Sequence, residues 1–154
     1  MECCEEMCWL DEIEIIDDFP EARRRCEESA GMHNKELGAE GEQTAVRYLM
    51  MRGYEILERN WVCPSGEADI IARDRDCIVF IEVKTRMHSE RGFPEEAVDA
   101  QKRARYEKIS AWYFTDYDGT DIRFRFDVIG VLVLSGERAI LRHHIDAFGE
   151  GCCL

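Results

Sequence analysis

Three charged residues lie within two neighbouring apolar segments and have the types needed for metal-assisted hydrolysis of a phosphate ester. Asp69 belongs to residues 66–71, and Glu82 and Lys84 belong to residues 78–86. Alternate side chains of a strand point to the same face, so Glu82 and Lys84 project together, ~6.6 Å apart along the strand. Carboxylates are hard oxygen donors for a divalent cation, and an ammonium orients a water or stabilises developing negative charge. These residue types therefore favour metal-assisted phosphodiester cleavage.

A purely structural role is the alternative for these three residues. Glu82 and Lys84 could form an ion pair on a solvated face at the end of a hairpin. However, their neighbours along the chain are mostly isoleucine, valine and phenylalanine, which indicates strands buried on much of both faces. Charged side chains in such surroundings are uncommon and need a specific reason. We therefore favour the functional interpretation.

The rest of the pattern predicts helices that pack on a mixed sheet. Residues 35–52 have helical spacing, and Gly53 follows at the position where glycine commonly ends helices. The other predicted elements are a strand over 54–63, a turn over 64–66, an antiparallel hairpin of strands 67–73 and 77–85, a helix over 95–114, and strands over 122–134 and 138–145. The order α-β-β-β-α-β-β predicts a mixed α/β sheet flanked by helices.

The first predicted helix carries a carboxylate on its apolar face. Glu42 shares that face with Ala45, Val46 and Leu49. Burying this charge alone is costly, and a bound cation is one way to compensate it. A capping or solvent-facing role is the alternative.

The packing of the helices gives two further expectations. Gly38 and Gly41 each cost ~1 kcal/mol relative to alanine in a helix interior, so they either permit close approach of the backbone or mark the helix start. In the second helix, the residues expected to face the sheet are Ala97, Ala100, Ala104, Ile109 and Trp112.

Composition restricts the class of protein. The chain has 154 residues, 45% of them hydrophobic, which fits one domain with tails. No run approaches the roughly 20 apolar residues that cross a bilayer, and the start lacks a basic signal-peptide region, so we expect a cytoplasmic protein without a membrane partner. The eight cysteines are then expected to be free thiols. A metal clip is the alternative, without the spacing of a zinc motif, formed by Cys3, Cys4, Cys8, Cys152 and Cys153.

Charge is distributed unevenly along the chain. The net charge of −13 disfavours a phosphate backbone as partner, but residues 1–30 alone hold 11 acids and 3 bases. Between residues 84 and 108 the sign reverses, with 7 bases against 5 acids. We therefore predict an acidic, cysteine-containing extension over 1–34 that is weakly structured or depends on a partner, a folded domain over 35–148, and a tail over 149–154.

The ordered motifs of the central region resemble a known family. They are Gly38-x2-Gly41-Glu42, the stretch 53–61, Gly66-Glu67-x-Asp69, Glu82-Val83-Lys84-Thr85-Arg86, the Lys102 region and Phe126-Asp127-Val128. Over roughly residues 35–148 the chain resembles the YraN family of predicted endonucleases. That family belongs to the restriction-endonuclease-like PD-(D/E)xK superfamily, together with archaeal Holliday-junction resolvases. Ala68 stands where this family usually has a larger aliphatic residue.

The resemblance implies a catalytic role for each motif residue. Asp69 and Glu82 would hold one or two Mg²⁺ or Mn²⁺ ions, helped by the backbone carbonyl of Val83. Glu42 would be an additional metal-binding carboxylate from the first helix. Lys84 would position the attacking water or stabilise the charge on the phosphate.

The expected function is metal-dependent hydrolysis of DNA phosphodiesters by an endonuclease that recognises DNA structure, such as branches, rather than sequence. Arg86, Gln101 and Lys102 are candidates for phosphate contact, with a solvated charged face as the alternative. A non-catalytic module that binds nucleic acid or protein on a nuclease fold is the alternative function. A protein that docks on the acidic N-terminal segment and a second copy of this chain are further expected partners.

Two positions near the C-terminus are expected to be structural. Asp127 lies between Phe126 and Val128 and should point to the opposite face of the strand, as a hydrogen-bonding residue. His143 and His144 are adjacent in a strand and should face apart, so we do not expect them to share one ion.

Overall fold

The elements of the fold follow the predicted order, with one strand added at each end. A computed structural model of the chain describes residues 11–16, 30–87, 100–118, 121–134, 138–148 and 152–153. The elements are β1 (Asp11–Ile16), α1 (Ala30–Met51), β2 (Glu55–Cys63), β3 (Gly66–Asp74), β4 (Cys77–Met87), α2 (Ala100–Tyr113), β5 (Arg123–Val133), β6 (Ala139–His144) and β7 (Cys152–Cys153).

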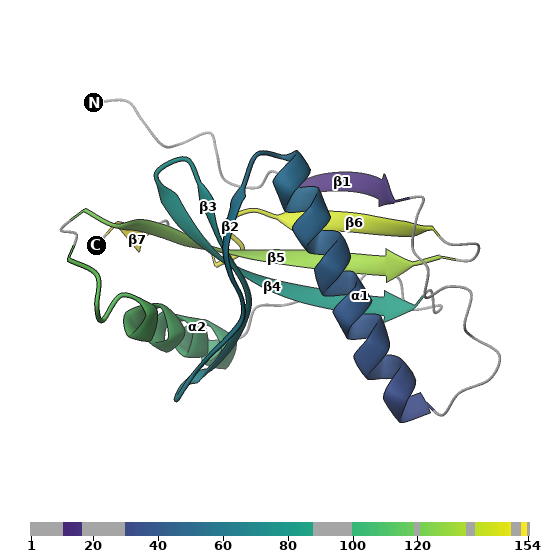
Figure 1. Cartoon of the computed structure of the whole chain (residues 1–154), viewed down its shortest axis with the longest axis horizontal. Helices are drawn as coiled ribbons and strands as arrows, with labels where there is room; N and C mark the ends of the chain where they lie inside the picture. The colour runs from purple at the N-terminus through teal and green to yellow at the C-terminus, as the bar shows by residue number, and fades with distance from the viewer. Residues whose placement is uncertain are drawn as a thin grey trace.

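These strands form one mixed sheet with the order β1-β6-β5-β4-β3-β2, and the short β7 pairs with β5 (Figure 1). The strands β4 and β5 run parallel, and the other described neighbouring pairs are antiparallel. A parallel pair needs a long crossover connection, which here contains α2. The prediction of a mixed α/β sheet flanked by helices is confirmed.

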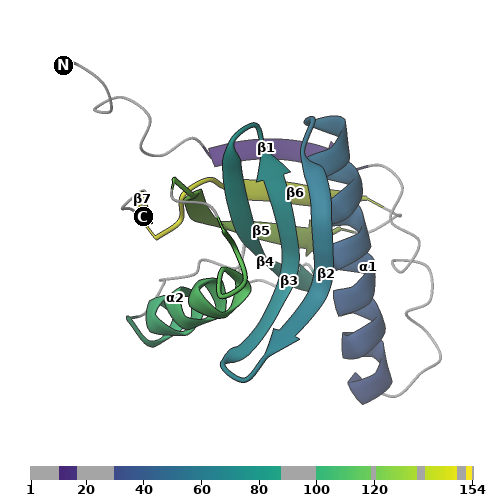
Figure 2. The same ribbon diagram turned by 60° about the vertical axis from the view of Figure 1, so that its left-hand side comes forward.

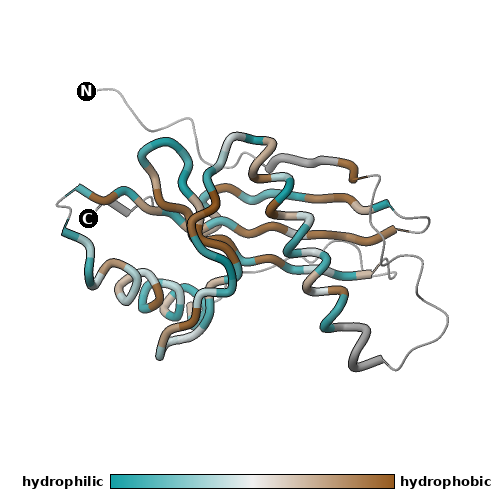
Figure 3. The backbone as a smooth tube through the Cα atoms, in the orientation of Figure 1, coloured by the Kyte–Doolittle hydropathy of each residue, from teal (hydrophilic) through white to brown (hydrophobic). Residues whose placement is uncertain are grey.

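Side chains of β4 alternate between two hydrophobic cores, one on each face of the sheet. Val79 and Ile81 belong to the core that α1 covers, and Ile78 and Phe80 belong to the core that α2 covers. Figure 2 shows the two helices on opposite sides of the curved strands, and Figure 3 shows the apolar residues concentrated along the central strands. The strand is therefore buried on both faces, as its continuous apolar sequence predicts.

The helix α1 begins earlier than predicted and ends where predicted. It starts at Ala30 rather than near residue 35, so the glycines inside it do not mark its start. At its end, Gly53 has a φ of 88°, and two hydrogen bonds close the last turn, from Gly53 N–H to Met50 and from Tyr54 N–H to Leu49. This pattern is the Schellman motif, in which glycine avoids the steric cost of a left-handed backbone.

Gly41 allows α1 to approach β4 closely. A Cβ at position 41 would lie 1.7 Å from Oγ1 and 2.9 Å from Cβ of Thr85. Position 38 has no atom within 4 Å of such a Cβ. The expected close backbone approach therefore holds for Gly41, and the contact is adjacent in sequence to both Glu42 and Lys84.

The prediction of which α2 residues face the sheet is confirmed for Ile109 and wrong for Ala100, Ala104 and Trp112. The buried residues of α2 are Tyr106, Ile109 and Ser110, whereas Ala100, Ala104 and Trp112 are exposed. Alanines bury little apolar area, so the larger Tyr106 and Ile109 determine which face of the helix packs on the sheet. Ala97 lies outside the described residues.

The N-terminal segment contributes to the sheet. Residues 11–16 form the edge strand β1, antiparallel to β6, within the segment for which the sequence predicted an extension that is weakly structured or depends on a partner. Cys63 and Cys77 are free thiols as expected, and the proposed clip cysteines have no described side chains. None of the helices in the described ranges combines the length and apolarity required to cross a bilayer.

Candidate functional site

The β3–β4 hairpin brings Asp69 beside the Glu82-Val83-Lys84 stretch. The pairing of β3 with β4 ends at Ile70 and Ile81, and Asp69 and Glu82 lie directly beyond that pair, at the open end of the hairpin. The Val83 N–H donates a hydrogen bond of 2.7 Å to Asp69 Oδ2. A tight connection between two apolar strands thus places the three charged residues that the sequence singles out at one end of the hairpin.

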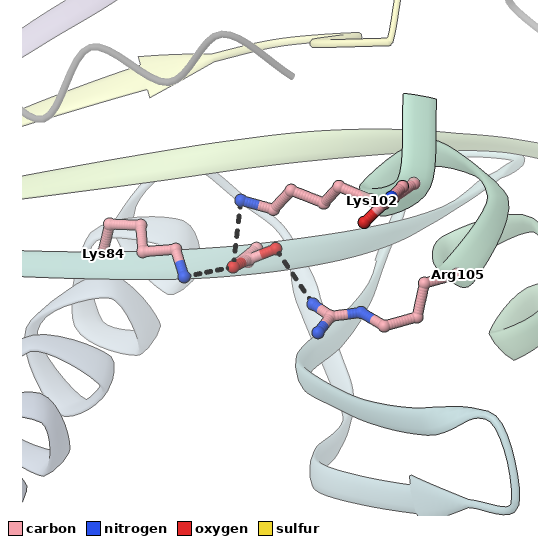
Figure 4. Close-up of a pocket in the computed structure, with 5 residues that line it drawn as sticks. Lys84, Lys102 and Arg105 are labelled. Carbon is pink, nitrogen blue, oxygen red and sulfur yellow. Dashed lines mark ion pairs between the residues drawn. The ribbon is translucent and has the colours of Figure 1, made fainter. Parts of the chain in front are cut away.

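Three basic side chains converge on the carboxylate of Glu82, which is only 3% exposed. The Nζ atoms of Lys84 and Lys102 lie 2.5 Å and 3.1 Å from Glu82 Oε1, and Arg105 Nη2 lies 3.6 Å from Oε2. Figure 4 shows Lys84 approaching from the strand and Lys102 and Arg105 from α2. Burial alone would raise the pKa of Glu82, but the hydrogen bonds and charges of Lys84 and Lys102 hold it below its usual value.

The surroundings of Asp69 raise its pKa, whereas those of Glu82 lower the pKa of that residue. Burial raises the pKa of Asp69 from 3.8 to about 6, although the hydrogen bond from Val83 opposes the shift. The negative charges of Glu42 and Glu82 add to the increase, and Lys84 lowers it. Glu42, from α1, and Glu82, from β4, are therefore close enough to Asp69 to repel its ionised form. Such repulsion is what a bound cation would remove.

The chemistry of this donor set fits a hard divalent cation. Asp69, Glu82 and Glu42 supply carboxylate oxygens, and Glu82 Oε2 is buried without a hydrogen-bond partner in the described structure. Among the described residues, no three acidic, histidine or cysteine side chains already stand in metal-binding geometry. Lys84 and Lys102 hold the other oxygen of Glu82, and Arg105 lies 3.6 Å from Oε2, so an ion at Oε2 requires the Arg105 side chain to move.

A pocket of about 460 Å³ opens next to Glu82. It is lined by residues of β4 and α2, namely Glu82, Lys84, Gln101, Lys102 and Arg105. Gln101 and Lys102, which the sequence proposed for phosphate contact, are therefore brought to the carboxylate. Arg86 is exposed further along β4 and does not line this pocket.

Arg105 is the site residue that sequence reasoning missed. Its place three residues after Lys102 puts both on neighbouring turns of α2, which was the available signal. Gly66 supports its side chain, because a Cβ at position 66 would meet Arg105 Cδ and Ile109 Cδ1 at 3.4 Å. The φ of Gly66 is 142°, which L residues rarely adopt. The β2–β3 turn thus packs on the aliphatic part of Arg105.

Tyr106 forms the floor under this cluster on the α2 side. Its ring is 1% exposed and lies beneath the guanidinium of Arg105, whose Cζ is 5.4 Å from the ring centroid. Burial and the negative charges of Glu82 and Asp69 raise the pKa of the Tyr106 hydroxyl above its usual value. The hydroxyl therefore remains protonated.

A second buried network surrounds Asp127, on the side of the sheet that α1 covers. The Asp127 carboxylate accepts from the Arg125 guanidinium at 3.0 Å and from the Asp146 N–H at 2.9 Å, and its Oδ2 lies 2.9 Å from His143 Nε2. The Tyr48 hydroxyl lies 3.3 Å from His143 Nδ1. The structural interpretation of Asp127 is confirmed, and His143 is fully buried in this network.

Comparison with known proteins identifies the family. The model of the uncharacterised protein family UPF0102 matches residues 41–131. A UPF0102 protein of Nocardia farcinica is 44% identical over 107 residues, which are 70% of this chain and 84% of the relative. A UPF0102 protein of Dictyoglomus thermophilum is 42% identical over 118 residues, or 76% of this chain and 100% of the relative. The chain belongs to the UPF0102 family, which is the YraN family that its motifs resemble.

Proposed function

We propose that this protein is a metal-dependent endonuclease that hydrolyses DNA phosphodiester bonds at the Glu82 pocket. The observation that carries this proposal is the meeting of Asp69, Glu82 and Lys84 at one end of the β3–β4 hairpin. The negative charges of Glu42 and Glu82 both repel the ionised form of Asp69. A Mg²⁺ or Mn²⁺ ion held by these carboxylates, with the Val83 carbonyl as a further donor, would polarise a water and offset phosphate charge.

The basic side chains of the pocket supply the chemistry that the chain itself contributes. Lys102 and Arg105 extend from α2 toward the same carboxylate as Lys84, so they form a ready site for a phosphate group. In the described structure the Glu82 carboxylate serves as their anion. A substrate phosphate would replace this internal anion, which frees Glu82 and leaves Lys84 positioned to orient a water or to stabilise charge on the phosphate.

The overall charge sets the expected strength of DNA binding. The chain carries a net charge of −13, so attraction to the phosphate backbone comes from a local group of cations rather than from the whole surface. Few phosphate contacts predict modest affinity that falls with salt. These side chains read no base edges in the proposed contacts, which favours recognition of DNA structure over sequence.

The proposal is tested by cleavage of labelled linear, flap and four-way DNA by the full chain in Mg²⁺ or Mn²⁺. Asp69→Asn and Lys84→Gln should each slow cleavage by at least about 100-fold, since each removes a charge from the site. Asp76→Asn is the matched control, because it removes an exposed carboxylate at the other end of the same hairpin. It should retain full activity. Absence of metal-dependent cleavage on every substrate, with DNA binding intact, would instead support the non-catalytic binding module.

A further inference from the structure

A stripe of residues on the exposed side of α2 leads away from the Glu82 pocket. Gln101, Arg105, Lys108 and Trp112 are spaced four, three and four residues apart, so they lie on one face of the helix. Gln101 and Arg105 line the Glu82 pocket. Lys108 and Trp112 line a second pocket of about 490 Å³ farther along the helix, next to Ser65 of the β2–β3 turn. The stripe thus connects two pockets.

Trp112 presents an apolar ring to solvent at the far end of this stripe. It is 49% exposed, whereas the neighbouring Tyr113 packs against Trp61 and Phe80 with ring centroids 5.3 Å and 5.5 Å away. Among the described residues no aromatic ring packs on Trp112. An exposed aromatic ring beside a pocket offers a face on which a nucleic-acid base can stack.

The charge of α2 is opposite to that of the chain. The helix contains four bases and one acid, Glu107, and the Arg103 side chain pairs with that acid at 3.2 Å. No carboxylate of the described residues pairs with Lys108. A lysine one turn before an exposed tryptophan can contact a phosphate while the indole packs on the attached base.

We propose that Trp112 stacks on an unpaired base of the DNA strand whose phosphate occupies the Glu82 pocket, and that Lys108 contacts a phosphate beside that base. This inference rests on the proposed function and adds the substrate class, DNA with a single-stranded segment. Seven residues separate Arg105 from Trp112, or ~10.5 Å along the helix axis. At ~3.4 Å per stacked nucleotide, the stacked base lies about three nucleotides from the bound phosphate.

The base must be unpaired for a physical reason. In a duplex, both faces of a base are covered by its neighbours, so a tryptophan can stack on it only after unstacking. A flap or a single strand has free faces and avoids that cost. The geometry therefore predicts that this protein binds flaps and single strands more tightly than blunt duplexes of the same length.

The test is the affinity of the full chain for a labelled single-stranded DNA, measured by fluorescence anisotropy in Ca²⁺ or EDTA so that cleavage is not needed. Trp112→Leu should weaken binding about tenfold, and Trp112→Phe should retain most of the affinity because a phenyl ring still stacks. Tyr117→Leu is the control, because it removes another exposed ring, 45% exposed, outside the stripe. It should leave the affinity unchanged.

An abasic-site scan gives the position of the contact. One missing base, about three nucleotides from the cleaved bond, should weaken binding by wild type and have no effect on Trp112→Leu. Equal affinity of wild type and Trp112→Leu, or an abasic scan without a sensitive position, overturns the inference. If cleavage occurs but neither cleavage nor binding depends on Trp112, the proposed function holds and the stacking site is rejected. Tryptophan-dependent binding without any cleavage supports the stacking site while rejecting the nuclease.

Discussion

Replacing Gly41 with alanine should destabilise the protein by forcing α1 away from β4. Glycine is usually the less stable choice in a helix interior, so Gly→Ala at an unobstructed site gains about 0.5–1 kcal/mol. At position 41 the new Cβ would lie 1.7 Å from Thr85 Oγ1 and 2.9 Å from Thr85 Cβ. A rotation of the Thr85 side chain relieves the first contact but leaves the second.

The expected size of the effect follows from these distances. Carbon atoms pack best at about 3.5–4.0 Å, so the helix or the strand must move by about 0.5 Å even after the rotation. Overpacking of this kind costs about 1–3 kcal/mol. After subtracting the helix-propensity gain, we expect Gly41→Ala to lower the free energy of unfolding by about 1 kcal/mol. The same shift moves Glu42 relative to Lys84, so cleavage should also fall.

The matched control is Gly38→Ala, three residues earlier in the same helix. No atom lies within 4 Å of a Cβ at that position, so this variant should be as stable as wild type or more stable by up to ~1 kcal/mol. Urea unfolding monitored by circular dichroism measures both variants, and Gly41→Ala/Thr85→Ala should recover part of the loss. If Gly41→Ala is no less stable than Gly38→Ala, the close approach of α1 to β4 is refuted.

Three further predictions concern charged groups. Since the pKa of Asp69 is raised to about 6 in the fold, its ionised form destabilises the metal-free protein. In urea unfolding with EDTA, Asp69→Asn should therefore be more stable than wild type by about 2–3 kcal/mol above pH 6. This gain should disappear as the pH falls to about 4, where the wild-type carboxyl is protonated. Asp127→Ala should cost about 3–5 kcal/mol, because it leaves the buried Arg125 and His143 without their shared partner, and calorimetry measures the loss. Arg105→Gln should lower the slope of log affinity against log salt by about one, as measured by DNA binding at several salt concentrations.

The meeting of Asp69, Glu82 and Lys84 at one end of the hairpin could be predicted because it depends on local pattern. Glu82 and Lys84 share a face through the alternation of a strand, and the short connection to the preceding strand brings Asp69 to the same end. Gly53 predicted the end of α1 for the same reason. The helix ends at a single residue in the left-handed conformation, which is a local requirement that glycine meets.

The features that sequence reasoning missed depend on contacts between distant segments. Arg105 becomes a site residue only because α2 packs with Tyr106 and Ile109 toward the sheet, and its alanines suggested another face. The edge strand β1 forms by pairing with β6, and its acidic sequence resembled an extension because nothing local specifies that partner. The network of Asp127 likewise joins side chains that are remote along the chain.

The most direct test of the proposed centre is the single-turnover rate of flap-DNA cleavage as a function of Mn²⁺ concentration. Wild type should show a rate that rises with Mn²⁺ and saturates, and Asp69→Asn should be slower by at least about 100-fold at saturation, because it loses a carboxylate that holds the ion. Asp76→Asn should match wild type throughout. Cleavage by Asp69→Asn at the wild-type rate, with the same dependence on Mn²⁺, would contradict a metal-dependent centre at this hairpin.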